Sequence, residues 1–319
     1  MKKIELHLHL EGAAPPTFIR GLAAEKRRPP PRIFSEDGTY RFDGFRDFLR
    51  VYEEAAALIE TPQDYARLVT IALENCAENG AVYAELFIAP DLCGRGDPEA
   101  WRDCLAAMEE AAAKMSAAGI DSRAVVTAIR HFDPVQSRRA AICAAEASGG
   151  WVAGFGLSGA ETVGLPGDFA WAFDCAREAG LGLTCHAGEF CGPHSIREAL
   201  DLGVTRIGHG IRAVEDKTLM QDLANAEITL ECCPGSNIAL GLCRDWASHP
   251  VARLLDAGIR VTISTDDPPF FGTSLQKEYD RLAASFDWGE AEFRQINQWA
   301  IDAAFCDKGV KDRLRKDIG

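Results

Sequence analysis

Two histidines near the start of the chain have the spacing of a shared metal site. His7 and His9 alternate with leucines in a short apolar run. Side chains two residues apart on a β-strand point to the same face, so both imidazoles can reach one ion. A single His-x-His pair is weak evidence, because the chain has seven histidines and such a pair arises readily by chance. The pair indicates a metal site only if further ligands end other strands.

Further polar residues do end other apolar runs. His186 ends the run 181–186, and His209 ends the run 206–209. Asp266 and Asp267 follow the run 260–265. His186 could be a metal ligand or a buried structural histidine. One of the two aspartates could instead be the N-cap of a helix, although the two prolines that follow make a helix start there less favourable.

Three imidazoles and one carboxylate form a ligand set that suits Zn²⁺, although iron or cobalt could occupy the same site. The candidates are the four histidines at strand ends and one of the two adjacent aspartates. A binuclear barrel hydrolase needs a bridging ligand, often a modified lysine, after the fourth strand. Residues 151–161 contain no lysine. We therefore expect one zinc ion per chain.

The elements that must position these residues alternate between strand and helix. Runs rich in β-branched and apolar residues predict strands at 4–8, 81–88, 124–129, 151–157, 181–186, 206–209, 228–232 and 260–265. Helical spacing predicts helices at 61–78 and 98–118, and further helices after prolines 134, 166, 193 and 250. Eight such repeats predict an α/β fold, a TIM (β/α)8 barrel spanning residues 1–319 as one domain. The reactive groups then share the mouth at the C-terminal ends of the strands.

The connection between the first two strands is much longer than a crossover requires. Residues 14–79 are therefore expected to include a helical lid insertion. The proline run 29–31 interrupts regular structure, after which Phe42, Phe45 and Phe48 recur at helical spacing. An equally weighted alternative is that these aromatic side chains only dock a helix on the barrel.

Composition restricts the partners. The formal net charge of −14 disfavours nucleic acid and anionic membranes, which leaves a small neutral ligand as the expected partner. The 11 cysteines are odd in number, and several lie in apolar segments, which favours reduced buried thiols over a disulfide scaffold. Polar residues interrupt any signal-peptide core near Met1, so we expect a cytoplasmic protein. The sequence does not indicate an oligomeric state.

Six segments together resemble the adenosine deaminases and their amidohydrolase relatives. They lie in the family's order along nearly the whole chain: His7-Leu8-His9-Leu10-Glu11-Gly12-Ala13, Leu157-Ser158-Gly159-Ala160-Glu161, His186-Ala187-Gly188-Glu189, Arg206-Ile207-Gly208-His209-Gly210, Cys233-Pro234-Gly235-Ser236-Asn237 and Ser264-Thr265-Asp266-Asp267-Pro268. The resemblance implies hydrolytic, zinc-dependent deamination of adenosine and 2′-deoxyadenosine to inosine nucleosides and ammonia.

The resemblance also implies roles for individual residues. His7, His9, His186 and Asp266 would hold the zinc ion. Glu189 would protonate N1 of the purine, while His209, with Asp267 nearby, would orient and deprotonate the attacking water. The backbone N–H of Gly159 would meet N3, and Asp267 would meet N7. His9 and Glu11 would border the substrate, with Glu11 near the ribose 5′-hydroxyl.

Adenine as the free base is the alternative substrate, and an N6-modified adenine nucleoside is another. Two features favour the nucleoside: the segment Gly156-Leu157-Ser158-Gly159, and Gly208 where relatives that act on the base tend to carry an acidic residue. A barrel that only binds purines is less consistent with the sequence, because every expected ligand and the expected acid are present.

Overall fold

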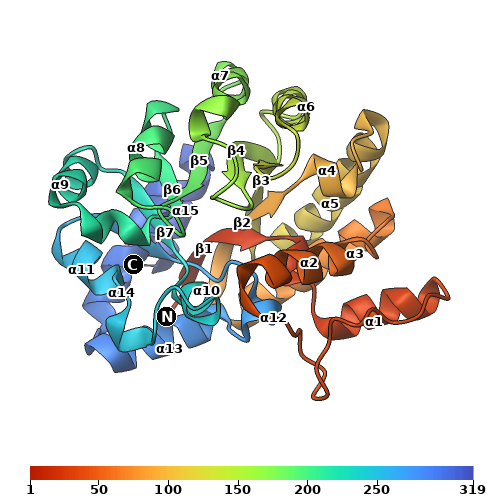
Figure 1. The fold of residues 1–319 in the computed structure, drawn as a ribbon, viewed down its shortest axis with the longest axis horizontal. Coiled ribbons are helices and arrows are strands. Elements are labelled where there is room, and N and C mark those ends of the chain that lie inside the picture. Colours follow the sequence, from red (N-terminus) through yellow and green to blue (C-terminus); the bar gives the residue numbers. More distant parts are fainter. Residues whose placement is uncertain (319) are drawn as a thin grey trace.

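The computed structural model describes residues 1–318. Eight parallel strands pair in chain order to form a barrel, and most of the helices surround it (Figure 1). The strands are β1 Lys3–His9, β2 Ala81–Ile88, β3 Asp121–Ile129, β4 Val152–Ser158, β5 Gly182–Ala187, β6 Arg206–His209, β7 Thr229–Cys232 and β8 Arg260–Ile263. The predicted TIM barrel is confirmed.

All eight predicted strands occur, and β2 and β6 have the predicted bounds. The largest difference at a functional strand end is in β8, which stops at Ile263 and not at residue 265. The next two side chains bind β1: Ser264 Oγ accepts a hydrogen bond from Leu6 N, and Thr265 Oγ1 donates one to Glu5. The last strand therefore ends at Ile263, and the two residues after it bind β1, where the barrel closes.

The barrel closes at the predicted metal ligands. Leu8 and Asp266 form the only described bridge between the first and last strand regions within residues 1–318. His9 N donates to Asp266 O, and Asp266 N donates to His7 O, both at 3.0 Å. Asp266 has a φ of +63°, an uncommon conformation for a residue with a side chain. Closing the barrel thus brings ligands from opposite ends of the chain together.

The helices predicted at 61–78 and 98–118 and after Pro134 begin close to the expected residues. Thr61 and Asp64 form a capping box at the start of α3, Asp97 caps α5, and Asp133 caps α6. The α-helices are α1 Pro16–Glu25, α2 Gly44–Ala56, α3 Pro62–Glu78, α4 Pro90–Cys93, α5 Pro98–Ala117, α6 Pro134–Glu146, α7 Ala170–Glu178, α8 Pro193–Asp201, α9 Lys217–Asn225, α10 Pro234–Ala239, α11 Val251–Asp256, α12 Pro268–Phe271, α13 Leu275–Phe286, α14 Glu290–Ala303 and α15 Lys308–Ile318. Short 3₁₀ helices lie at Glu11–Ala13, Pro166–Phe169, Ile211–Glu215 and Trp246–Ser248.

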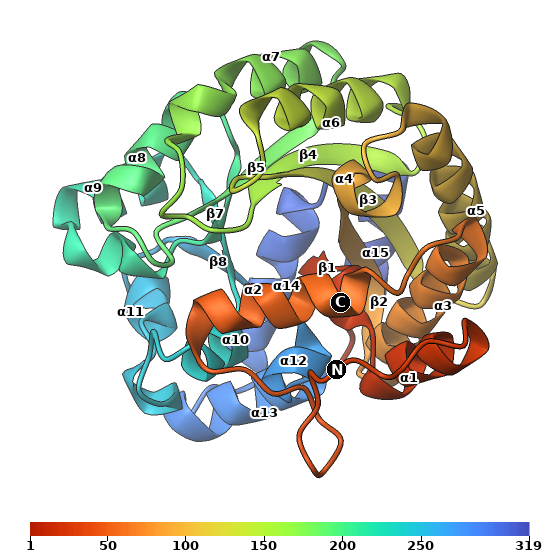
Figure 2. The ribbon, with the colours of Figure 1, turned by 45° about the vertical axis from the view of Figure 1, so that its right-hand side comes forward.

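The long insertion has two parts. Helix α3 belongs to the outer ring, where it packs against α5 and β2. Helix α2 crosses the front of the ring of strands (Figure 2). Only α2 and its flanking loops therefore lie where a lid would act.

The opposite end of the barrel is closed by the C-terminal helices. A separate apolar cluster joins Ile4 and Leu6 of β1 and Tyr83 of β2 to α14 and α15. All 11 cysteines are unpaired and most are buried, as expected for reduced thiols. Among the helices of residues 1–318, none combines the length and the hydropathy that a bilayer crossing requires.

Candidate active site

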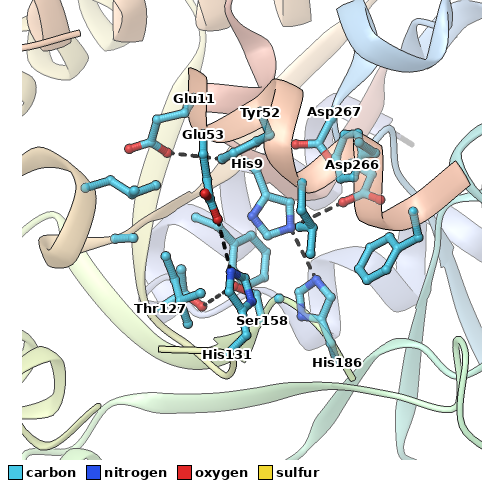
Figure 3. Close-up of a pocket in the computed structure, with 18 of the residues that line it drawn as sticks. His9, Glu11, Tyr52, Glu53, Thr127, His131, Ser158, His186, Asp266 and Asp267 are labelled. Atoms are coloured by element: carbon cyan, nitrogen blue, oxygen red, sulfur yellow. Dashed lines mark hydrogen bonds and ion pairs between the residues drawn. The ribbon is translucent and has the colours of Figure 1, made fainter. Parts of the chain in front are cut away.

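Four predicted ligands converge at the C-terminal end of the barrel. His7 and His9 come from β1, His186 from β5, and Asp266 from the turn after β8. One ligand atom from each of the four lies within 4.8 Å of those of the other three. His9 Nε2 is 3.2 Å from both His186 Nε2 and Asp266 Oδ1 (Figure 3). His7 Nε2 is 3.4 Å from the same oxygen.

The outer nitrogens of two histidines are already engaged. His7 Nδ1 donates to Glu231 Oε2 at 2.6 Å, and His186 Nδ1 donates to the carbonyl oxygen of Leu157 at 3.0 Å. Each bond leaves the Nε2 lone pair directed at the centre. His7 Nε2 is buried and has no hydrogen-bond partner. Metal-binding histidines have this arrangement, with the second nitrogen held by a carboxylate or a carbonyl.

The electrostatics of the centre require a cation. Burial alone would lower the pKa of His7, but Asp266 and Glu231 together raise it to about 10. Burial holds the pKa of His186 well below its usual value, so that imidazole is neutral. Without a metal ion these carboxylates hold a proton on His7; a bound divalent cation would take the place of that proton and leave neutral imidazoles beside an ionised aspartate. The residues therefore fit a divalent metal ion.

Residues that support this centre were not predicted from the sequence. Glu231 of β7 lies between His7 and Arg206, whose Nε donates to Glu231 Oε1 at 2.5 Å. Ser236 Oγ donates to Asp266 Oδ2 at 2.6 Å. The signal for Glu231 was a charged residue inside an otherwise apolar strand, which only a buried partner can accommodate. Ser236 lies in a segment quoted for the family resemblance, but its contact could not be inferred.

His209 lies next to the four ligands at the end of β6. Its φ is +61°, and its Nδ1 lies 3.3 Å from Asn237 Nδ2, which fixes the ring. Its Nε2 is 3.8 Å from Glu189 Oε1 and 3.9 Å from Asp266 Oδ2. These two carboxylates approach Nε2 directly, and Asp267, which the resemblance places nearby, lines the same pocket. Burial lowers the pKa of His209 to about 4, so the ring is neutral at pH 7.

Glu189 occupies the position expected of a proton donor. Its side chain lines the same pocket as His9 and His209 and is almost fully buried. Burial, with smaller contributions from Asp266 and Glu161, raises the pKa of Glu189 well above its usual value. A carboxyl group that stays protonated at pH 7 can donate a proton.

Asp267 differs from the prediction in one respect. A short helix, α12, begins directly after it at Pro268, although the prolines were taken to disfavour a helix start. Proline is tolerated in the first turn because the N–H groups there have no helical partner. Burial, followed by Asp266 and Glu189, raises the pKa of Asp267 well above its usual value.

The pocket brings together the predicted substrate residues. It has an empty volume of about 720 Å³, including the solvent at its mouth. The ninth predicted site residue, His7, belongs to the candidate metal site and does not line the pocket. The other eight line it: His9, Glu11, Gly159, His186, Glu189, His209, Asp266 and Asp267. Glu11 is buried, which raises its pKa to about 7.

Helix α2 supplies the other side of the pocket. Phe45, Phe48 and Tyr52 line it. Phe45 also contacts Phe190, the neighbour of the proton-donor candidate, with ring centroids 4.2 Å apart. Phe42, Phe45 and Phe48 all pack in or against the hydrophobic core, so all three dock the helix, and Phe45 and Phe48 line the pocket as well.

The whole chain matches known proteins. Residues 2–319 match the model of the adenosine deaminase family. The chain is 43% identical over 320 residues to an adenine deaminase of Rhizobium rhizogenes and 45% identical over 317 residues to one of Rhizobium johnstonii, with 98% of both chains covered in each case. A crystal structure of adenine deaminase from Arthrobacter aurescens has a TM-score of 0.91 at 29% identity, covering 99% of this chain and 97% of that one. The chain thus belongs to the adenosine deaminase family.

Proposed function

We propose that this protein is a zinc-dependent adenine deaminase that converts adenine and water to hypoxanthine and ammonia. The observation that carries the choice of substrate is the full-length match to relatives named adenine deaminase, at 43% and 45% identity. These relatives favour the free base over adenosine, the substrate that the sequence motifs favoured.

The two features that favoured adenosine have a different physical explanation. A Cβ atom at Gly208 would lie 3.0 Å from His7 Cε1 and 3.1 Å from His186 Nδ1. A Cβ atom at Gly159, where φ is +90°, would lie 2.6 Å from His131 Nδ1. A side chain at either position would crowd a neighbouring histidine, so packing accounts for both glycines. These glycines therefore carry no information about a ribose.

The residues at the mouth of the pocket also favour a substrate that has no ribosyl group. His131 Nε2, from the loop after β3, lies 3.3 Å from Glu53 Oε1 of helix α2 (Figure 3). Both residues line the pocket, and the Glu53 side chain is half exposed. A purine with C6 at the metal centre directs N9 away from it, toward the mouth. A ribosyl group on N9 would then have to displace this pair, whereas a free base would not.

The chain's own residues can perform the remaining steps. Zinc, held by the four ligands, would lower the pKa of water to about 7 and so supply the nucleophile. Neutral His209 would orient that water toward C6, take a proton from it as the C6–O bond forms, and return the proton to the amino group as the C6–N bond breaks and ammonia leaves. Glu189, which burial keeps protonated, donates its proton to N1 as C6 becomes tetrahedral. Neutral Asp267 donates a hydrogen bond to N7, and the N–H of Gly159 reaches N3.

Ammonia release from purified enzyme tests the proposal. We expect kcat/KM for adenine to exceed that for adenosine and for 2′-deoxyadenosine by about 100-fold or more, since the pocket mouth excludes a ribose. The variant Glu53→Ala should keep adenine turnover within a few-fold and raise adenosine turnover. Equal or greater activity on adenosine in the wild type would refute the assignment of adenine.

The metal is tested separately by elemental analysis. We expect one zinc ion per chain, lost on chelation together with activity. A stoichiometry near two, or full activity without metal, would contradict the mononuclear site.

A further inference from the structure

One carboxylate, that of Glu161, holds the segment that carries Glu189. Glu161 Oε1 accepts a hydrogen bond from the backbone N–H of Gly188 at 2.6 Å and another from the Ser195 hydroxyl. Glu161 Oε2 accepts three more, from the backbone N–H groups of residues 189–191 at 3.1, 2.6 and 2.9 Å. Four consecutive backbone donors and one hydroxyl therefore converge on a single side chain.

The backbone after β5 is shaped to make this convergence possible. Gly188 has a φ of +68°, and a Cβ atom there would lie 2.4 Å from Ile196 Cδ1. Successive N–H groups that point to one side form a concavity that binds anions. Here the anion comes from the protein itself. Glu161 is only 3% exposed, and every hydrogen bond described to its carboxylate comes from an uncharged donor.

The opposite side of the same segment is held as well. Arg212 donates to the carbonyl oxygen of Phe190 at 2.5 Å, and Arg130 donates to that of His186 at 2.8 Å. N–H groups and carbonyl groups of this turn are thus bound by charged side chains of opposite sign. The turn connects a metal ligand to Glu189, so its shape sets the distance between the acid and the metal centre.

We propose that Glu161 is a positioning residue for the deamination, holding the backbone of Glu189 so that its carboxyl group meets N1 of the bound purine. The inference rests on the proposed function, in which Glu189 is the proton donor. A displacement of about 1 Å at a reacting group can reduce the rate by about 100-fold, so a residue that fixes this turn has a catalytic consequence without touching the substrate.

The charge of Glu161 has a second consequence. Burial is the main cause of the raised pKa of Glu189, and Asp266 and Glu161 raise it further. Glu161 therefore also favours the protonated form of the acid. Its removal should shift the alkaline limit of kcat to lower pH, because Glu189 would then lose its proton more readily.

The variant Glu161→Gln tests the proposal in the zinc-loaded enzyme with adenine. The glutamine NH₂ group would face backbone N–H donors, so bonds to the turn are lost while the side-chain volume is kept. We expect kcat to fall by about 10- to 100-fold, with KM within a few-fold and zinc content unchanged. Amide hydrogen exchange at residues 188–191 should accelerate in the absence of substrate. Glu74→Gln, on the exposed face of α3, is the matched control and should change none of these.

Ser195→Ala removes one of the five donors and keeps the carboxylate. We expect a kcat lower by only about 2- to 5-fold, with faster exchange at Gly188. Ser195→Ala tests the proposal if Glu161→Gln does not fold. Wild-type kcat, pH profile and exchange in a folded Glu161→Gln, or unchanged kcat and exchange in Ser195→Ala, would overturn it. A wild-type enzyme inactive on adenine would refute the proposed function, while the exchange data would still decide whether Glu161 holds the turn.

Discussion

The barrel buries two groups of charged side chains, and only one of them is balanced by a cationic side chain. The paired cluster consists of Arg206, Glu85 and Glu231. Arg206 donates to Glu231 at 2.5 Å and to Glu85 at 2.6 Å, and all three side chains are fully buried. Although burial opposes ionisation, Arg206 and His7 lower the pKa of Glu231 to about 2. Arg206 thus forms an ion pair with each carboxylate, although its second terminal nitrogen, Nη2, has no hydrogen-bond partner.

The other group, which we call the mouth cluster, lines the pocket and comprises Glu11, Glu189, Asp266 and Asp267. Burial is the first cause of the raised pKa of Glu11, Glu189 and Asp267. Asp266 stays ionised through contacts with His7 and His9. The difference between the clusters is instructive: the carboxylates beside Arg206 anchor the barrel, while the acids of the mouth cluster have raised pKa values or, in the case of Asp266, adjoin the candidate metal site.

Breaking the paired cluster should have the largest effect. Arg206→Met leaves Glu85 and Glu231 buried without their cation, so we expect the free energy of unfolding to fall by about 3–5 kcal/mol. Urea unfolding measures it. Arg315→Met, which removes a half-exposed ion pair with Asp302, is the control and should cost about 0–1 kcal/mol. Equal losses in the two variants would mean that the buried cluster is not a structural anchor.

Removing the acid of the mouth cluster comes next. Glu189→Gln keeps size and polarity but has no carboxyl proton, so we expect kcat for adenine to fall by about 100-fold or more with zinc retained. The wild type should lose rate as pH rises through the raised pKa of Glu189, and the variant should not. Loss of zinc, or turnover within a few-fold of the wild type, would show that Glu189 is not the proton donor.

A smaller effect is expected from displacing Asp267. A Cβ atom at Gly12 would lie 1.7 Å from Asp267 Oδ1 and 2.9 Å from Asp267 Cβ. In Gly12→Ala that side chain must move, and we expect kcat/KM to fall by about 10- to 100-fold while zinc stays bound. Gly21→Ala is the matched control, because no heavy atom lies within 4 Å of the added group. Activity close to the wild type in Gly12→Ala would exclude a substrate contact by Asp267.

The smallest effect concerns Glu278, a buried acid outside the pocket that also lacks an arginine. Burial raises its pKa from an ordinary 4.5 to about 8. Between these values the folded state holds a proton that the unfolded state has released, so stability falls as pH rises from about 4.5 to 8. Glu278→Gln does not titrate, and its amide can keep both bonds, to Gly235 N and to Thr273 Oγ1.

Thermal unfolding at pH 5 and pH 8 checks this prediction. Relative to the wild type, Glu278→Gln should have a higher Tm at pH 8 than at pH 5. The exposed Glu178→Gln should show no such dependence. A Tm difference between Glu278→Gln and the wild type that is the same at both pH values would show that Glu278 does not cause the pH dependence of stability.

The barrel and the clustering of the four candidate ligands could be predicted because both depend on local patterns. Alternating apolar residues mark each strand, and a polar residue at a strand end lies at the mouth of a barrel whatever its partners are. His7, His9, His186 and Asp266 all follow that rule. The start of α12 was misjudged because the prolines were weighed as helix breakers, although the first turn tolerates them.

The partners of these residues could not be predicted, because they come from distant segments. Nothing near His7 in the sequence indicates that Glu231 binds its outer nitrogen, or that Arg206 compensates Glu231. The pair of Glu53 and His131 depends on how α2 crosses the barrel, which a long insertion leaves undetermined. Side chains that define the substrate are thus harder to find from the sequence than those that define the metal.

The closure of the barrel at Leu8 and Asp266 has a consequence for the order of assembly. During synthesis the ribosome releases His7 and His9 first, but the strand region that completes their site is made only near the end. Contacts between residues so distant in sequence form late, since a long loop must close first. We expect nascent chains truncated before residue 260 to hold zinc poorly, so the metal joins the finished enzyme and not its growing precursor.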